Sequence, residues 1–171
     1  MSAEWPHRHP GIVTGLPRID SSGASHRHGP VLSTVVAVDV FVFLRRERLP
    51  TTEQWQSALD RLSIDVQLDA SIDARSHSGY WPARAGEHQS GFEFFVGPVA
   101  EVFGQAAPSG ADDRDIAANF VTHTDMRELQ CSMLAAAALG VVADGLVLDD
   151  ETESLVLPEQ FLEQTRGIDF A

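Results

Sequence analysis

VLSTVVAVDVFVFL, residues 31–44, is the stretch that decides the fold. Valine occupies every second position from 36 to 42, and the positions between are mostly apolar apart from Asp39. β-Branched and aromatic residues in this alternation favour a strand. Because both sets of positions are apolar, the sequence predicts a long strand that is largely covered on both faces.

An amphipathic helix is predicted directly after this strand. The charged residues 45–48 end the strand, and Thr51 or Thr52 can cap the helix that follows. Apolar residues at 55, 58, 59 and 62 have the i, i+3, i+4, i+7 spacing of one helix face. The helix is therefore expected to run to about Leu62 and to bury Trp55.

The remaining chain alternates short strands with two further helices. Strands are predicted at 64–68, 79–83, 91–96 and 115–121, and the longest helix runs from Thr124 to about Ala143. The small residues 135–138 allow this helix to lie close to a sheet. Short strands at 146–148 and 155–157 flank an acidic turn, and Pro158 opens a last helix that ends near Arg166.

This order of elements predicts an α+β fold. Short turns between neighbouring strands favour a mostly antiparallel sheet of about five to seven strands. The long helix and the two shorter helices are expected to pack mainly on one face of it. Residues 1–30 are rich in His, Pro, Gly and Ser without periodicity, so they are predicted to be an irregular leader before a single domain at 31–171.

Composition sets limits on the environment and cofactors of the chain. An apolar fraction of 43% is enough for a packed core. The single cysteine, Cys131, excludes an internal disulfide and a multi-cysteine zinc site. We expect a cytoplasmic protein, because nothing resembles a signal peptide or a transmembrane run.

The negative charge of the chain is unevenly distributed. The formal net charge is −13, of which residues 1–30 contribute +1 and residues 31–171 contribute −14. Such a field repels nucleic acid and anionic membranes and favours either solubility or a basic partner protein. Two acidic loops are candidate contact patches for that partner; they contain Asp112, Asp113, Asp115, Asp149, Asp150, Glu151 and Glu153.

No motif in the sequence indicates a cofactor or a metal. A phosphate-binding glycine loop, a Gly-x-Ser-x-Gly elbow and a His-Glu-x-x-His pair are all missing. The acidic loops lack the ligand spacing and the glycine of an EF-hand. The His-Arg-His triplets at 7–9 and 26–28 lie in the irregular leader, where a fixed metal geometry is not expected.

A few side chains remain as candidates for chemistry or contact. His123 and Asp125 flank the start of the long helix, where they can form a small polar site or simply cap the helix. Cys131 is expected to be a small packing residue, because it lies beyond the first helical turn. Glu93 is predicted to point with Phe95 toward the less covered face of the sheet. Tyr80 and Trp81 are expected beside them across a hairpin.

Several segments in this order resemble a family of small bacterial proteins. They are SGYWPA at 78–83, SGFEFFVGP at 90–98, the alanine-rich helix 129–143 that ends at Asp144-Gly145, and then 146–149 with an acidic turn. The order, over residues 31–167, resembles immunity proteins that are encoded beside secreted or contact-delivered polymorphic toxins.

The resemblance implies an antidote that is not an enzyme. It would bind a cognate, basic toxin domain and block its active site, with Tyr80, Trp81 or Phe95 as aromatic anchors. The alternatives are a secretion adaptor or another protein-binding module, and a small enzyme that uses His123, Asp125 or Glu93. Homo-oligomerisation stays open.

Overall fold

A computed structural model describes residues 37–123, 125–149 and 152–168 of the chain. The chain divides after Val35, and every described residue belongs to the second unit. The leader predicted at 1–30 and the first residues of the predicted strand at 31–44 lie outside the described residues. The helices and strands are β1 Ala37–Leu44, α1 Thr52–Arg61, β2 Val66–Leu68, β3 Gly79–Ala85, β4 His88–Pro98, α2 Val99–Val102, β5 Ile116–His123, α3 Met126–Ala143, β6 Leu146–Asp149, β7 Ser154–Val156 and α4 Pro158–Arg166.

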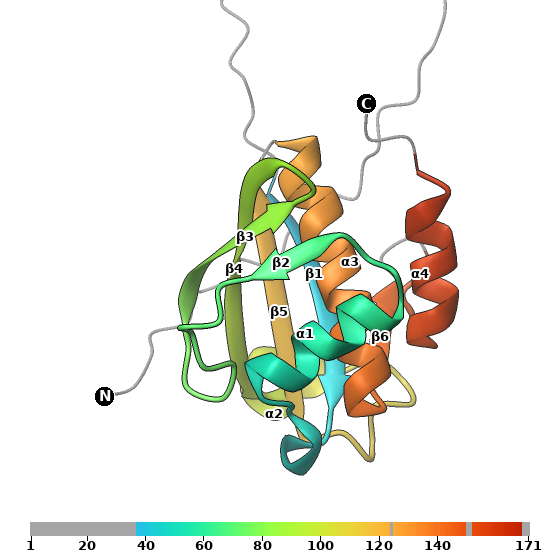
Figure 1. Cartoon of the computed structure of the whole chain (residues 1–171). Coiled ribbons are helices and arrows are strands. Elements are labelled where there is room, and N and C mark those ends of the chain that lie inside the picture. The colour runs from blue at the N-terminus through green and yellow to red at the C-terminus, as the bar shows by residue number, and fades with distance from the viewer. Residues whose placement is uncertain (1–36, 124, 150–151, 169–171) are drawn as a thin grey trace, which may run out of the picture. The chain divides into compact units, whose positions relative to one another are not determined.

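The strands form one antiparallel sheet in the order β2-β3-β4-β5-β1-β6-β7 (Figure 1). β1 pairs with β5 along its whole length and with β6 at Val42 and Phe43. β1 therefore has a neighbouring strand on each edge, and its apolar side chains are packed against apolar residues on both faces of the sheet. The predicted α+β class and the antiparallel sheet are confirmed, and the predicted strands and helices follow one another as expected. The short helix α2 between β4 and β5 was not predicted.

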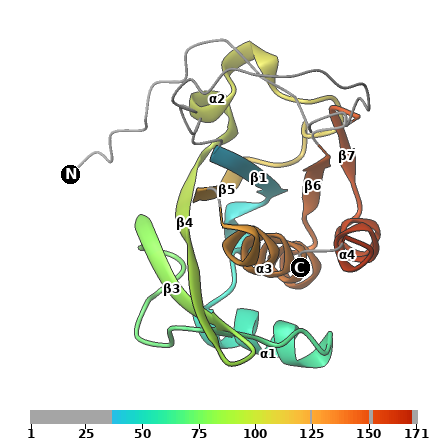
Figure 2. The ribbon, with the colours of Figure 1, turned by 90° about the horizontal axis from the view of Figure 1, so that it is seen from above.

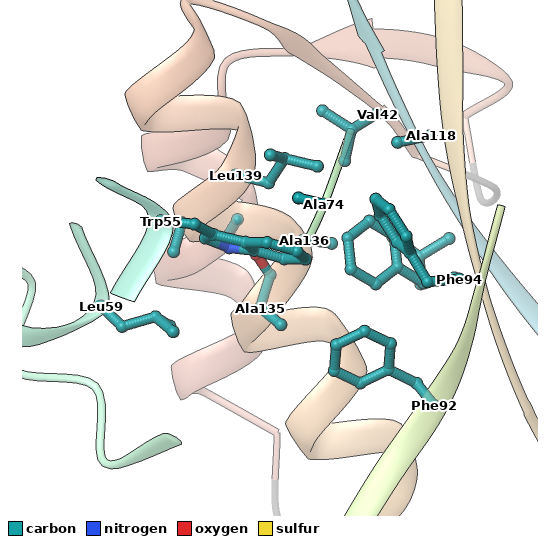
Figure 3. Close-up of a cluster of buried hydrophobic side chains, with 14 of the residues drawn as sticks. Val42, Trp55, Leu59, Ala74, Phe92, Phe94, Ala118, Ala135, Ala136 and Leu139 are labelled. Atoms are coloured by element: carbon teal, nitrogen blue, oxygen red, sulfur yellow. The ribbon is translucent and has the colours of Figure 1, made fainter. Parts of the chain in front are cut away.

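Three helices cover one face of the sheet, which we call the helical face. Figure 2 shows α1, α3 and α4 on this side and α2 on the other. The core between the sheet and these helices is centred on Trp55, which is fully buried. Its indole Nε1 donates a hydrogen bond of 2.9 Å to the carbonyl oxygen of Ala135, so the only polar atom of the side chain is satisfied (Figure 3).

The long helix α3 lies close to the sheet because its inner side is small. Residues 135–138 are all alanine and all fully buried, as the sequence predicted. Met126, the first residue of α3, is 47% exposed. Among the described residues α3 is the one helix long and apolar enough to cross a membrane, but here it packs against β1, β4, β5 and α4 as a core helix.

The other face of the sheet has a smaller apolar cluster at the β1 side. Phe41 and Phe43 of β1 pack there against Phe103, with ring centroids 4.9 and 5.1 Å apart. Val99 of α2 and Ala117 of β5 complete the cluster. We call this side of the sheet the second face. Further along it, over β3 and β4, this face includes the exposed Tyr80 and the partly exposed Glu93.

Candidate functional site

Tyr80, Glu93 and His123 lie side by side on the second face, each on a different strand. Tyr80 of β3 is directly opposite Glu93 of β4, and Glu93 is opposite Val121 of β5. His123 lies two residues beyond Val121, so it occupies the diagonal position on the same face. Tyr80 is 54% exposed, which makes it one of the few large exposed apolar side chains among the described residues.

Glu93 has a weak partner within the chain. Its Oε1 lies 3.7 Å from Nε2 of His123, and both side chains are substantially exposed. Charge-assisted hydrogen bonds usually measure about 2.7–2.9 Å, so this contact leaves most of the acceptor capacity of the carboxylate unused. No other described residue forms an ion pair with Glu93. The carboxylate is therefore available for an external cation.

The ring of Tyr80 occupies the space that a side chain at position 91 would fill. A Cβ atom at position 91 would lie 2.3 Å from the Tyr80 hydroxyl oxygen, so only glycine leaves room for the ring. The hydroxyl donates a hydrogen bond of 3.3 Å to the carbonyl oxygen of Ser90. Partial burial, followed by the negative charge of Glu128, raises the pKa of Tyr80. We call Tyr80, Gly91, Glu93 and His123 the Tyr80–Glu93 site.

Acidic side chains at the start of α3 border this site. The carboxylate of Asp125 caps the helix by accepting a hydrogen bond of 2.8 Å from the backbone N–H of Arg127. The cap occupies one oxygen of the carboxylate that was considered for catalysis together with His123. Burial raises the pKa of Glu128, the charge of Asp125 raises it further, and His123 acts in the opposite direction. The border of the site is therefore negatively charged.

The prediction that Trp81 can serve as an exposed anchor is wrong. Side chains alternate along a strand, so the neighbour of the outward-pointing Tyr80 points to the helical face. Trp81 is fully buried there, with its ring centroid 5.3 Å from that of Trp55. Phe95 follows Glu93 on the second face and is half-buried; its role as an anchor stays a prediction.

In the first acidic loop, at 112–115, two aspartates bind arginines that are distant in the sequence. The carboxylate of Asp113 accepts a hydrogen bond of 2.8 Å from Nη2 of Arg45 and also contacts Arg114. Asp115 accepts a hydrogen bond of 2.7 Å from the backbone N–H of Arg46. The bond from Arg45 lowers the pKa of Asp113. We call Arg45, Arg46, Asp113, Arg114 and Asp115 the arginine–aspartate cluster.

The arginine–aspartate cluster is a structural brace between three segments. Arg114, whose side chain is 9% exposed, also donates a hydrogen bond of 3.1 Å to the carbonyl oxygen of Asp144, the left-handed residue that ends α3. Asp112 is exposed and does not contact these arginines. Three arginines contact two of the three aspartates of this loop, so the region is far less negative than the loop sequence alone predicts.

The second acidic loop joins β6 to β7. Asp150 and Glu151 lie outside the described residues. Thr152 donates a hydrogen bond of 3.0 Å to the carboxylate of Asp149, and Glu153 adopts a left-handed backbone with φ of 52°. Two strands separate β6 from β4 in the sheet, so this loop and the Tyr80–Glu93 site do not share one strand pair. Its role in partner contact stays a prediction.

Cys131 belongs to the core rather than to a reactive site. It is fully buried, and this burial raises the pKa of its thiol to about 11. Because the thiolate is the reactive form, the side chain is a packing residue at neutral pH. In the described part of the chain, no group of three or more His, Cys, Asp or Glu side chains is arranged to hold a metal ion. The two His-Arg-His triplets lie outside that part.

Neither the sequence nor the fold matches a known protein family, a curated protein or a solved structure at a significant level. The resemblance to immunity proteins therefore stays a prediction that rests on the residues quoted for it.

Proposed function

We propose that this domain is an acidic, non-enzymatic antidote that binds a cognate, basic bacterial toxin domain and blocks its active site. The observation that carries the proposal is the Tyr80–Glu93 site. It combines an exposed aromatic ring with a carboxylate whose one partner in the described chain is a histidine at 3.7 Å. An aromatic ring beside a carboxylate with unused hydrogen-bond acceptor capacity is suited to bind a basic protein surface.

The charge balance of the described residues supports a basic partner. They include 20 Asp and Glu against nine Arg, a formal net charge of −11. Several arginines are also bound to the chain's own carbonyl groups: Arg75 donates to Leu49 and Arg166 to Leu62. A field of this sign accelerates encounter with a basic domain and repels nucleic acid.

Tight inhibition requires more than long-range attraction. Charges on the rim of an interface add little affinity, whereas a buried aromatic side chain often contributes a large share. Tyr80 is the described aromatic side chain most exposed for this purpose, and its hydroxyl group already donates a hydrogen bond to the backbone of Ser90 before binding. Because the ring is already ordered, little conformational entropy is lost when it is covered.

The test begins with the gene that lies next to this one. If it encodes a toxin-tipped protein, the purified toxin domain should bind the full chain and lose its activity in a one-to-one mixture. Tyr80→Ala should weaken binding by about tenfold or more in calorimetry. Glu53→Ala, at an exposed acid of α1 on the helical face, is the matched control and should change the affinity less than about twofold.

The same experiment separates the alternatives. A partner that binds but keeps its activity would favour the secretion adaptor or another protein-binding module. The antidote proposal is rejected if the toxin domain does not bind, or if Tyr80→Ala binds and inhibits as well as the wild type. Raising the salt concentration should slow association by about tenfold if charge steers the encounter.

A further inference from the structure

The carboxylate of Glu93 is bordered by one imidazole group and one aromatic ring. His123 lies 3.7 Å away on the diagonal of the β4–β5 pair, and Tyr80 lies directly opposite on β3. Arg127, the nearest arginine at the start of α3, contacts His88 at 3.4 Å. In the described chain, the carboxylate of Glu93 therefore has room for a second cation but receives none.

We propose that Glu93 receives the guanidinium group of an arginine from the partner, and that His123 competes for the same carboxylate, so that protonation of His123 weakens binding. This inference rests on the proposed function, because it names the partner group that the Tyr80–Glu93 site takes and the condition that regulates it.

The geometry favours arginine over lysine. Directly opposite residues on antiparallel strands have Cβ atoms about 4.5–5.5 Å apart, so the Tyr80 ring and the Glu93 carboxylate border one small area. A planar guanidinium group can donate two parallel hydrogen bonds to a carboxylate and stack on an aromatic ring at the same time. An ammonium group is a compact, strongly hydrated charge that cannot make the bidentate contact.

His123 is surrounded by groups that favour a cation at its position. Glu93 faces it from β4, Asp125 and Glu128 border it at the start of α3, and Asp39 takes the diagonal position on β1. Tyr80 is the titratable group contributed by β3. When the imidazole is protonated, it therefore forms an ion pair with Glu93, and an incoming arginine has to displace it against like-charge repulsion.

The expected direction of the pH effect follows from this competition. Histidine side chains change charge between about pH 5 and 8, whereas carboxylates stay ionised over most of that range. At the acidic end the site already holds a cation, so the partner's arginine binds weakly. At the alkaline end the imidazole is neutral and the carboxylate is open. Affinity should therefore rise with pH.

The experiment uses the full chain and a fluorescent octa-arginine peptide as probe, with octa-lysine as comparison, at constant ionic strength. The wild type should bind octa-arginine more tightly at about pH 8 than at about pH 5.5. The ratio of these two affinities should be about threefold larger for the wild type than for His123→Gln. Glu93→Gln should weaken octa-arginine binding at the higher pH and remove the same share of the pH dependence. It should affect octa-lysine less.

A matched control and a folding check make the result decisive. His88→Gln removes another exposed histidine of β4 and should keep the wild-type ratio of affinities. Circular dichroism melting establishes that each variant is folded, and Glu93→Asp is the second variant if Glu93→Gln is not. The proposal is overturned if His123→Gln keeps the full pH dependence, or if folded Glu93→Gln binds octa-arginine like the wild type.

The outcomes also separate this inference from the proposed function. A toxin domain that is bound and inhibited with the same affinity at both pH values rejects the competition by His123 and leaves the antidote proposal standing. Conversely, a pH-dependent arginine site in a chain that inhibits no toxin supports the competition and rejects the antidote.

Discussion

The arginine–aspartate cluster and the Tyr80–Glu93 site lie at opposite ends of β5, and they use their carboxylates in different ways. Asp115 immediately precedes the strand and His123 ends it, which places the two regions about 25 Å apart. Asp113 is held by two arginines, with a bond of 2.8 Å from Arg45. Glu93 has a histidine at 3.7 Å.

The difference shows that a run of acids in the sequence does not locate an available negative charge. The loop at 112–115 has the higher density of aspartates, yet Arg45 and Arg46, which come from 68 and 69 residues earlier, satisfy two of them. Glu93 is a single acid among aromatic residues, and it stays available because no arginine among the described residues reaches it.

The largest expected effect is at the glycine beneath Tyr80. In Gly91→Ala, the new Cβ would lie 2.3 Å from the Tyr80 hydroxyl oxygen and 2.7 Å from the carbonyl oxygen of Trp81. We expect a loss of about 3 kcal/mol in the free energy of unfolding, measured by urea denaturation. In a Tyr80→Ala background the cost should be smaller but not zero, because the backbone contact with Trp81 remains. An equal cost in both backgrounds would show that Tyr80 does not rest on Gly91.

The brace should be the next most sensitive region. Arg114→Ala removes a nearly buried guanidinium group that contacts Asp113 and the end of α3 at Asp144. We expect a loss of about 2 kcal/mol in the free energy of unfolding, again from urea denaturation. Arg48→Ala, an exposed arginine in the turn after β1, is the control and should change it by less than about 0.5 kcal/mol. A similar loss of stability in both variants would show that the contacts of Arg114 with Asp113 and Asp144 do not stabilise the fold.

The pH dependence of the free energy of unfolding should show how much the ionised carboxylate of Asp113 stabilises the fold. Its pKa is lowered in the folded protein by the hydrogen bond from Arg45, so it stabilises the fold above its unfolded value of 3.8, and this contribution is lost as the pH falls through the folded value. Asp113→Asn should therefore lose less stability than the wild type between about pH 5 and pH 2. Asp112→Asn should follow the wild-type curve. The pKa of Asp69 is also lowered, by hydrogen bonds from Ser71. Every variant should therefore still lose some stability as the pH falls.

The smallest expected effect has the opposite sign and lies beside the Tyr80–Glu93 site. Burial raises the pKa of Glu128 above its unfolded value of 4.5, so the contribution of this group to stability is present below that value and is lost as the pH rises through the folded one. Glu128→Gln should therefore melt slightly higher relative to the wild type at neutral pH than at about pH 4. Glu101→Gln, an exposed acid on α2, should show no such trend. A larger relative gain for Glu128→Gln at the acidic end would contradict the assignment.

Much of the fold could be predicted from local patterns. The alternation of β1, the stripe of α1 and the small residues of α3 each specify an element and its inner face without reference to distant residues. The capping box of Thr51 and Gln54 and the left-handed Asp144 confirm the expected ends of α1 and α3. Local patterns work here because periodicity and capping depend only on neighbours within a few residues.

The candidate site was predictable only in part. A hairpin between two predicted strands placed Tyr80 beside Glu93, and the structure confirms that pairing. The assignment of Trp81 failed because the prediction set two consecutive strand residues on one surface, although they must point to opposite faces. The diagonal contact with His123 depends on the register between β4 and β5, which no local pattern fixes.

By itself, the sequence determined the α+β class, the order of the strands and of the three longer helices, the apolar face of α1 that contains Trp55, and the excess of acid over arginine. Tertiary structure alone decided which acids remain available. The order of strands brings Arg45 to Asp113 and keeps every described arginine away from Glu93. The physical reason is that secondary structure arises from neighbours in the chain, whereas the charge presented at a surface depends on pairing between segments that are far apart in it.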